Sequence, residues 1–162
     1  MDQFRIAISK EQILFAAAHF ITYGDGTAEA LHGHNYRAGV SMAGPLDPHH
    51  LVFDFVRLKR ELEQVVGELD HRTLLASGNP LLPLEAADGE IVVRAKERRY
   101  VFPASDVRVL DLPNTTAEML AAWIADRLLE RLGAGAAGLT EIEIEVEESN
   151  GQSAFCLRPL PG

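Results

Sequence analysis

The chain has 162 residues, 47% of them hydrophobic, and a formal net charge of −9. That length and apolar content can bury one substantial core, so we expect a single domain over residues 1–162. The acidic balance argues against a nucleic-acid or membrane partner, because both attract basic surfaces. A single cysteine, Cys156, excludes an internal disulfide, and the sequence shows neither a signal pattern nor a spanning apolar run. We therefore expect a cytoplasmic protein.

Hydrophobic alternation predicts two long strands in the first third of the chain. Apolar residues alternate with polar ones from Phe4 and resume after a short polar interruption, which indicates one long or bulged strand over residues 4–21. The turn signal Gly24-Asp25-Gly26 then leads into a second strand over residues 31–43. We expect the two strands to pair antiparallel.

Three histidines on these strands suggest a metal site. His32 and His34 are two residues apart, so they project from the same face of a strand. His19 has the parity of Phe15 and Ala17 in the preceding apolar run. Three neutral imidazoles suit a catalytic Zn²⁺ with one open position. The alternative is a set of hydrogen-bonded core histidines, which is the commoner fate of a single histidine.

Two amphipathic helices follow in the sequence. Asp54 can cap a helix whose apolar spacing continues to Leu69, and Asp70-His71 come directly after it. Residues 77–113 show weak periodicity apart from a hairpin pattern around Lys96, and we interpret this stretch as an insertion. A capping box at Thr115 predicts the start of the second helix.

The C-terminal pattern predicts a hairpin and places a carboxylate on a buried face. Ile142, Ile144 and Val146 alternate with glutamates, and Glu148 takes the parity of the apolar residues, where it needs a partner. Asn150-Gly151 predicts a tight turn into a last strand. The element order predicts an α+β fold: an antiparallel four-stranded sheet with two helices on one face and open edges that neighbouring subunits could pair.

Six separated motifs resemble the 6-pyruvoyltetrahydropterin synthase / 6-carboxytetrahydropterin synthase family. The resemblance implies the tunnelling fold (T-fold), in which subunits join their sheets into a barrel as trimers or hexamers. It implies that the three histidines hold Zn²⁺, that Glu148 anchors a pterin with Thr116 beside it, and that Asp70 and His71 form the acid/base pair. The motifs are Ala17-Ala18-His19, Leu31-His32-Gly33-His34-Asn35-Tyr36, Asp54-Phe55, Leu69-Asp70-His71, Thr116-Ala117-Glu118 and Val146-Glu147-Glu148-Ser149.

One position departs from the family pattern. Ala28 stands where the family has its catalytic cysteine, and Glu29 is the nearest ionisable side chain. A divergent branch that uses a glutamate resembles this sequence and cleaves the dihydroneopterin side chain to 6-hydroxymethyldihydropterin. We therefore predict a zinc-dependent pterin side-chain lyase acting on 7,8-dihydroneopterin or its triphosphate, with Glu29 among the catalytic residues. The alternatives are a catalytically silent zinc- and pterin-binding homologue, or a zinc site that hydrolyses an unrelated substrate.

Overall fold

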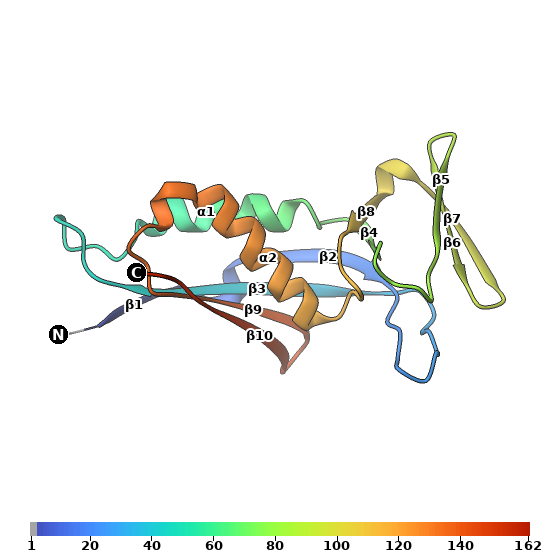
Figure 1. Ribbon diagram of the computed structural model, residues 1–162, viewed down its shortest axis with the longest axis horizontal. Helices are drawn as coiled ribbons and strands as arrows, with labels where there is room; N and C mark the ends of the chain where they lie inside the picture. Colours follow the sequence, from blue (N-terminus) through green and yellow to red (C-terminus); the bar gives the residue numbers. More distant parts are fainter. Residues whose placement is uncertain (1–2) are drawn as a thin grey trace.

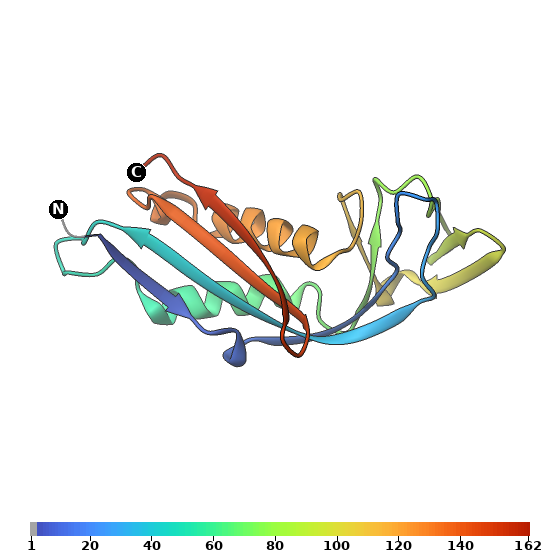
Figure 2. The same cartoon turned by 90° about the horizontal axis from the view of Figure 1, so that it is seen from below.

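The computed structural model describes residues 3–162 as a large twisted sheet with two helices on one side and a small three-stranded sheet at one end (Figures 1 and 2). In the large sheet the strand order is β10-β9-β3-β2-β4-β8, and β1 also pairs with β3. Its strands are β1 (Phe4–Ile8), β2 (Leu14–His19), β3 (His32–Gly44), β4 (Arg72–Ala76), β8 (Val107–Leu110), β9 (Glu141–Ser149) and β10 (Gln152–Pro159). The helices are α1 (Phe55–Gly67) and α2 (Ala117–Leu132).

The first predicted strand is divided into two. A 3₁₀ turn at Lys10–Gln12 separates β1 from β2, and both strands pair antiparallel with β3. The turn packs closely on β3 at Gly39, where an added Cβ would lie 3.1 Å from the Lys10 backbone nitrogen and 3.2 Å from the Ile8 carbonyl oxygen. The polar interruption in the sequence therefore marks a real break between two strands. On either side of it, β1 pairs with residues 40–44 of β3 and β2 pairs with residues 32–37.

The predicted α+β class and the two helices on one face are confirmed, while the sheet is larger than four strands. Beyond β2 it continues through β4 and β8, both added in parallel, with Ala17 opposite Arg72 and Thr73 opposite Val107. These two strands have five and four residues, too short for their alternation to stand out in the sequence.

The helix caps agree with the sequence at one helix and differ by one residue at the other. The Asp54 side chain accepts hydrogen bonds from the backbone N–H groups of Val56 (2.7 Å) and Arg57 (3.2 Å), as predicted. The cap of α2 is Thr116, not Thr115, and it accepts from the Met119 N–H. Thr115 instead donates to the carbonyl of Phe20 at 2.8 Å, which ties the start of α2 to the end of β2.

The expected hairpin in residues 77–113 is present as β6 (Glu90–Ala95) and β7 (Arg98–Pro103), joined at its edge by β5 (Leu84–Ala87). It packs on a second, smaller hydrophobic cluster, separate from the main core between the helices and the large sheet. The buried members of this second cluster are Phe20, Leu75, Leu82, Val93 and Ala95. Within residues 3–162 we find no helix whose length and hydropathy would let it cross a membrane.

Candidate metal centre

Strand pairing brings the three predicted histidines together. β2 and β3 are antiparallel with His19 directly opposite His32, and His34 lies two residues further along the same face of β3. The Nε2 atoms of His19 and His32 are 3.1 Å apart, and one ring nitrogen from each of the three residues lies within 4.8 Å of the others. His19 is fully buried, whereas His32 and His34 border a cavity. The three side chains could thus hold one ion at the floor of an open pocket.

The hydrogen bonds of the imidazoles leave their inner nitrogens free to bind a metal. His19 Nδ1 lies 2.8 Å from the Thr115 carbonyl oxygen and His32 Nδ1 lies 2.9 Å from that of Ala30. A carbonyl only accepts, so each Nδ1 carries the proton and each Nε2 presents a lone pair to the cluster. His34 Nε2 is buried and has no hydrogen-bond partner among residues 3–162. This donor set fits a divalent metal ion such as Zn²⁺.

The electrostatics of His19 keep it in the neutral form that a metal requires. Burial, helped by the neighbouring His32 and His34, lowers the pKa of His19 to about 4, although the hydrogen bond to Thr115 and the charge of Glu29 act in the opposite direction. A neutral imidazole is a ligand without first losing a proton. The innermost donor is therefore ready to coordinate across the physiological pH range.

Glu148 faces the histidine cluster, as its parity in the sequence predicts. Its Oε1 lies 3.5 Å from His19 Nε2, 3.8 Å from His34 Nε2 and 3.4 Å from the Tyr36 hydroxyl. Burial, followed by the negative charge of Glu148, raises the pKa of Tyr36, so the phenol stays protonated and can donate to the carboxylate. Tyr36 itself is fully buried and stacks on Phe15. The Tyr36 hydroxyl thereby orients the carboxylate, and among residues 3–162 the contacts found for Glu148 involve Oε1, which leaves Oε2 for a ligand.

A cavity of about 410 Å³ opens over the cluster and includes most of the predicted site residues. Glu29 stands at its wall: the carboxylate accepts a hydrogen bond from the Tyr23 hydroxyl, and its other oxygen is 3.4 Å from His32 Nε2. The sequence analysis did not single out Tyr23, although its hydroxyl contacts Glu29 and it lines the cavity. The available signal was its position six residues before Glu29, with the Gly24-Asp25-Gly26 turn between them, which brings the two residues close together. The lining includes Tyr23, Glu29, His32, His34, Thr116 and Glu148.

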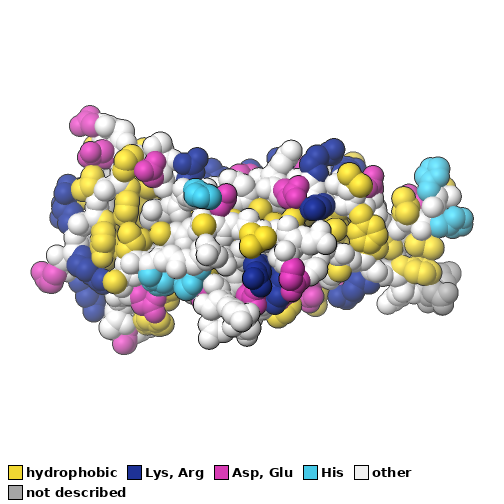
Figure 3. All heavy atoms as spheres, turned by 180° about the vertical axis from the view of Figure 1, so that it is seen from behind, with side chains coloured by type: hydrophobic (Ala, Val, Ile, Leu, Met, Phe, Trp, Pro, Cys, Tyr) yellow, Lys and Arg dark blue, Asp and Glu magenta, His cyan; other side chains and the backbone are white. Residues whose placement is uncertain are grey.

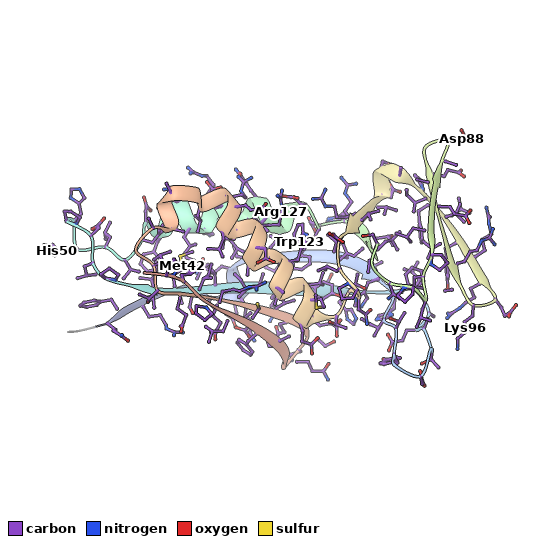
Figure 4. The ribbon with its side chains drawn as sticks, in the orientation of Figure 1. Met42, His50, Asp88, Lys96, Trp123 and Arg127 are labelled. Carbon is purple, nitrogen blue, oxygen red and sulfur yellow. The ribbon has the colours of Figure 1, made fainter. Side chains whose placement is uncertain are left out.

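No thiol lines this cavity. Ala28 lies in the β2–β3 loop and forms an isolated bridge with Thr22. Cys156 is in β10, where its half-buried side chain packs against the main core. His49 and His50 are also remote: Figure 4 shows His50 in the loop at the opposite end of the molecule from Lys96. The ionisable groups on hand are therefore imidazoles, carboxylates and a phenol.

Asp70 and His71 form a pair, but they do not line the cavity that includes Glu29, His32 and Glu148. Asp70 Oδ2 is 2.9 Å from His71 Nδ1, and Asp70 Oδ1 accepts from the Ala16 N–H at 2.8 Å. That amide, together with His71, lowers the pKa of Asp70. The His71 side chain is 83% exposed. The imidazole borders a second cavity of about 500 Å³ that includes Ala16, Ala18 and Arg72. The lining of this second cavity also includes His34 of the histidine centre, whereas neither Asp70 nor His71 lines the cavity that includes Glu29 and Glu148.

The fold and the site define a T-fold protein with a three-histidine centre that can hold a metal beside an inward-facing carboxylate. A family model for 6-pyruvoyl tetrahydropterin synthase matches residues 7–159, and the chain belongs to this family of pterin-processing enzymes. It is 32% identical over 146 residues to a putative 6-carboxy-5,6,7,8-tetrahydropterin synthase of Methanocaldococcus jannaschii, covering 89% of this chain and 88% of that one.

Two further relatives bear on the site. A dihydroneopterin monophosphate aldolase of Pyrococcus furiosus is 40% identical over 118 residues, which cover 73% of this chain and 71% of that protein. The crystal structure of 6-pyruvoyl tetrahydropterin synthase from Plasmodium vivax matches the fold with a TM-score of 0.92 at 24% identity, covering 99% of this chain and 100% of that one. In two variants of the Plasmodium vivax protein, a glutamate described as a catalytic residue is replaced by alanine or by cysteine.

Proposed function

We propose that the protein is a zinc-dependent lyase that cleaves the side chain of 7,8-dihydroneopterin or one of its phosphates. The bond between the first and second side-chain carbons would break, giving 6-hydroxymethyl-7,8-dihydropterin and a two-carbon aldehyde. The observation that carries the proposal is the carboxylate of Glu29, which stands beside His32 in a cavity without a thiol. The aldolase among the relatives, and the catalytic glutamate of the Plasmodium vivax protein, support the same assignment.

We assign the metal to His19, His32 and His34. Their three nitrogen donors leave a position open toward the cavity, the arrangement that catalytic zinc sites share. A Zn²⁺ ion bound there would act as a Lewis acid toward the side-chain hydroxyls of the substrate and lower their pKa. The carbonyls of Thr115 and Ala30, which hold the two Nδ1 atoms, fix the ring orientations before any ion arrives.

We assign pterin recognition to Glu148 and Thr116. The pterin ring presents an N–H and an amino group side by side, and a carboxylate can accept from both in a bidentate pair. Glu148 is held at the cavity by Tyr36, and Thr116 borders the same cavity at the N-terminus of α2. These two contacts would direct the substrate side chain toward the histidines.

Glu29 is the base in this proposal. It would take the proton from the hydroxyl on the second side-chain carbon, after which the carbon–carbon bond breaks and that carbon becomes the aldehyde. The electron pair passes into the pterin ring, and a proton then returns to the first carbon. Ala28 leaves no thiolate for the other family route, which begins with removal of a carbon-bound proton. We therefore expect little pyruvoyl-forming activity.

We propose that Asp70 and His71 serve the site of a neighbouring subunit in a homo-oligomer, a trimer or hexamer. The His71 imidazole is exposed, and no residue of the pair lines the cavity of its own chain that holds Glu29 and Glu148. The sheet also has large hydrophobic side chains exposed on the face away from the helices, among them Leu14 and Phe155, both 58% exposed. Figure 3 shows one face of the molecule, on which hydrophobic side chains lie at the surface among charged ones. Within residues 3–162, β8 and β10 stand at the two ends of the strand order and each pairs with one strand, so a second subunit could pair with their outer edges.

The proposal is tested by incubating the zinc-loaded protein with 7,8-dihydroneopterin, its monophosphate and its triphosphate, and identifying products by mass spectrometry. We expect 6-hydroxymethyl-7,8-dihydropterin from at least one of them. A protein that binds these compounds without turnover would be the catalytically silent homologue. Ala28→Cys then gives a further check, because a gain of pyruvoyl product would show that only the nucleophile was missing.

A further inference from the structure

The loop that carries Glu29 connects β2 to β3 and is shaped by hydrogen bonds of its own backbone. Within the loop, the Glu29 N–H donates to the Ile21 carbonyl at 2.8 Å, and the Tyr23 N–H donates to the Thr27 carbonyl at 2.9 Å. Its base is fixed through Thr22, whose hydroxyl accepts from Asn79 Nδ2. These bonds shape the loop but do not fix the segment from Ala28 onward against the rest of the protein.

Arg98 supplies that missing attachment. Its Nη2 donates to the carbonyl oxygens of Ala28 at 2.9 Å and of Glu29 at 3.2 Å. Within residues 3–162 the Arg98 guanidinium makes no ion pair within 4 Å, so the interactions found for this charge are with backbone carbonyls of the loop. A hydrogen bond from a charged donor is stronger than one between neutral groups, and Arg98 is half-buried, which limits screening by water.

Hydrophobic packing also attaches the loop to the β6–β7 hairpin near the Arg98 contact. Ala28 and Leu31, on either side of Glu29, pack on the second hydrophobic cluster beside Val93 and Ala95 of β6. Arg98 pairs with Ala95 across the β6–β7 turn, whose tip is marked by Lys96 in Figure 4. The hairpin thus presents both an apolar surface and a cation to the same stretch of loop.

We propose that Arg98 is a positioning residue for Glu29: by holding the two carbonyls, it keeps the carboxylate at His32 and within the cavity. This inference rests on the proposed function, in which Glu29 is the base. A base displaced by about 1 Å loses on the order of 100-fold in rate, because proton transfer requires hydrogen-bond reach. The hairpin in residues 77–113 would then be part of the catalytic apparatus, although it contributes no group that touches the substrate.

The test compares Arg98→Met, which keeps the apolar stem and removes the charge, with the matched control Arg94→Met. Arg94 lies in β6 of the same hairpin, where its side chain is exposed and, among the described residues, forms one ion pair, with Glu85 at 3.7 Å. We expect Arg98→Met to lower kcat about 10- to 100-fold with KM changed less than about threefold, and to speed amide hydrogen exchange over residues 21–31. Arg94→Met should match the wild type in both measurements, and zinc content should be equal in all three proteins.

The hydrogen-exchange measurement separates this inference from the proposed function. If the wild-type protein shows no turnover, the proposed function fails, and the exchange rates alone decide whether Arg98 holds the loop. Arg98→Lys keeps the positive charge and should restore part of both kcat and protection; it also carries the test if the methionine variant does not fold. Wild-type exchange and wild-type kcat in Arg98→Met would overturn the inference, as would an equal loss in Arg94→Met.

Discussion

Mild acid should destabilise the metal-free protein because protonation would place a positive charge on the buried side chain of His19. The His19 side chain is fully buried, and its Nδ1–H is already donated to the Thr115 carbonyl. Protonation of Nε2 would place a cation in the core beside His32 and His34, with the carboxylate of Glu148 at 3.5 Å as partial compensation. Burial accordingly lowers the pKa of His19 from 6.5 to about 4.

The sign and size of the effect follow from proton linkage. The unfolded chain takes up the His19 proton near pH 6.5 and the folded chain only near pH 4, so between these values the unfolded state holds more protons and stability falls as pH falls. From about pH 7.5 to about pH 5 the expected loss is about 2 kcal/mol. Below about pH 4 this contribution levels off, and carboxylates with lowered pKa values, such as Asp70, take over.

The measurement is urea unfolding of the chelator-treated protein at these two pH values. The wild type and the control His49→Gln, which changes an exposed loop histidine, should both lose about 2 kcal/mol of unfolding free energy. His19→Gln should lose far less, whatever its stability at neutral pH. An undiminished pH dependence in His19→Gln would refute the reasoning, because the proton would then be taken up elsewhere.

Two further predictions concern the neighbouring-subunit proposal and the packing of the centre. Glu29→Gln and His71→Ala should each lower turnover at least about 100-fold while zinc is retained. Mixed oligomers refolded from both variants should regain part of the turnover, because some sites then combine an intact Glu29 from one subunit with an intact His71 from another. A mixture as inactive as the single variants would contradict shared sites. Gly33→Ala should lower the unfolding free energy by about 1–3 kcal/mol, measured by urea denaturation, because the new Cβ would meet the Ala17 carbonyl oxygen at 3.0 Å; wild-type stability would show that β2 and β3 can separate there.

The histidine centre could be predicted from sequence because strand geometry is periodic. His32 and His34 needed only the alternation of one strand, and His19 needed one further assumption, that the preceding apolar run pairs with it. The same alternation placed Glu148 on the inner face. Glu147 is a contrast: the alternation placed it on the outer face, yet its side chain is only 6% exposed because Lys10 and Arg37 cover it. Alternation gives the face of a strand, whereas coverage depends on neighbours distant in sequence.

The features that sequence could not give depend on contacts between separate elements. Thr115 and Thr116 could each cap α2 by residue type. Thr116 is the cap because the Thr115 hydroxyl instead donates a hydrogen bond to the carbonyl of Phe20, a residue distant in sequence. The parallel strands β4 and β8 are too short to be read from alternation. The position of His71 depends on the same contacts: β4, which begins at the next residue, pairs in parallel with β2, and His71 lines the second cavity, not the one that Glu29 lines.

The central claim is that the three-histidine cavity cleaves a carbon–carbon bond in a dihydropterin side chain. Its most direct test is the reaction of the zinc-loaded protein with 7,8-dihydroneopterin, its monophosphate and its triphosphate, each in heavy water, with the products analysed by mass spectrometry. We predict 6-hydroxymethyl-7,8-dihydropterin with one solvent deuterium on the side-chain carbon, together with an equal amount of the two-carbon aldehyde. If all three compounds stay unchanged, or if the product is a pterin that carries a pyruvoyl or carboxyl group instead, the account is contradicted.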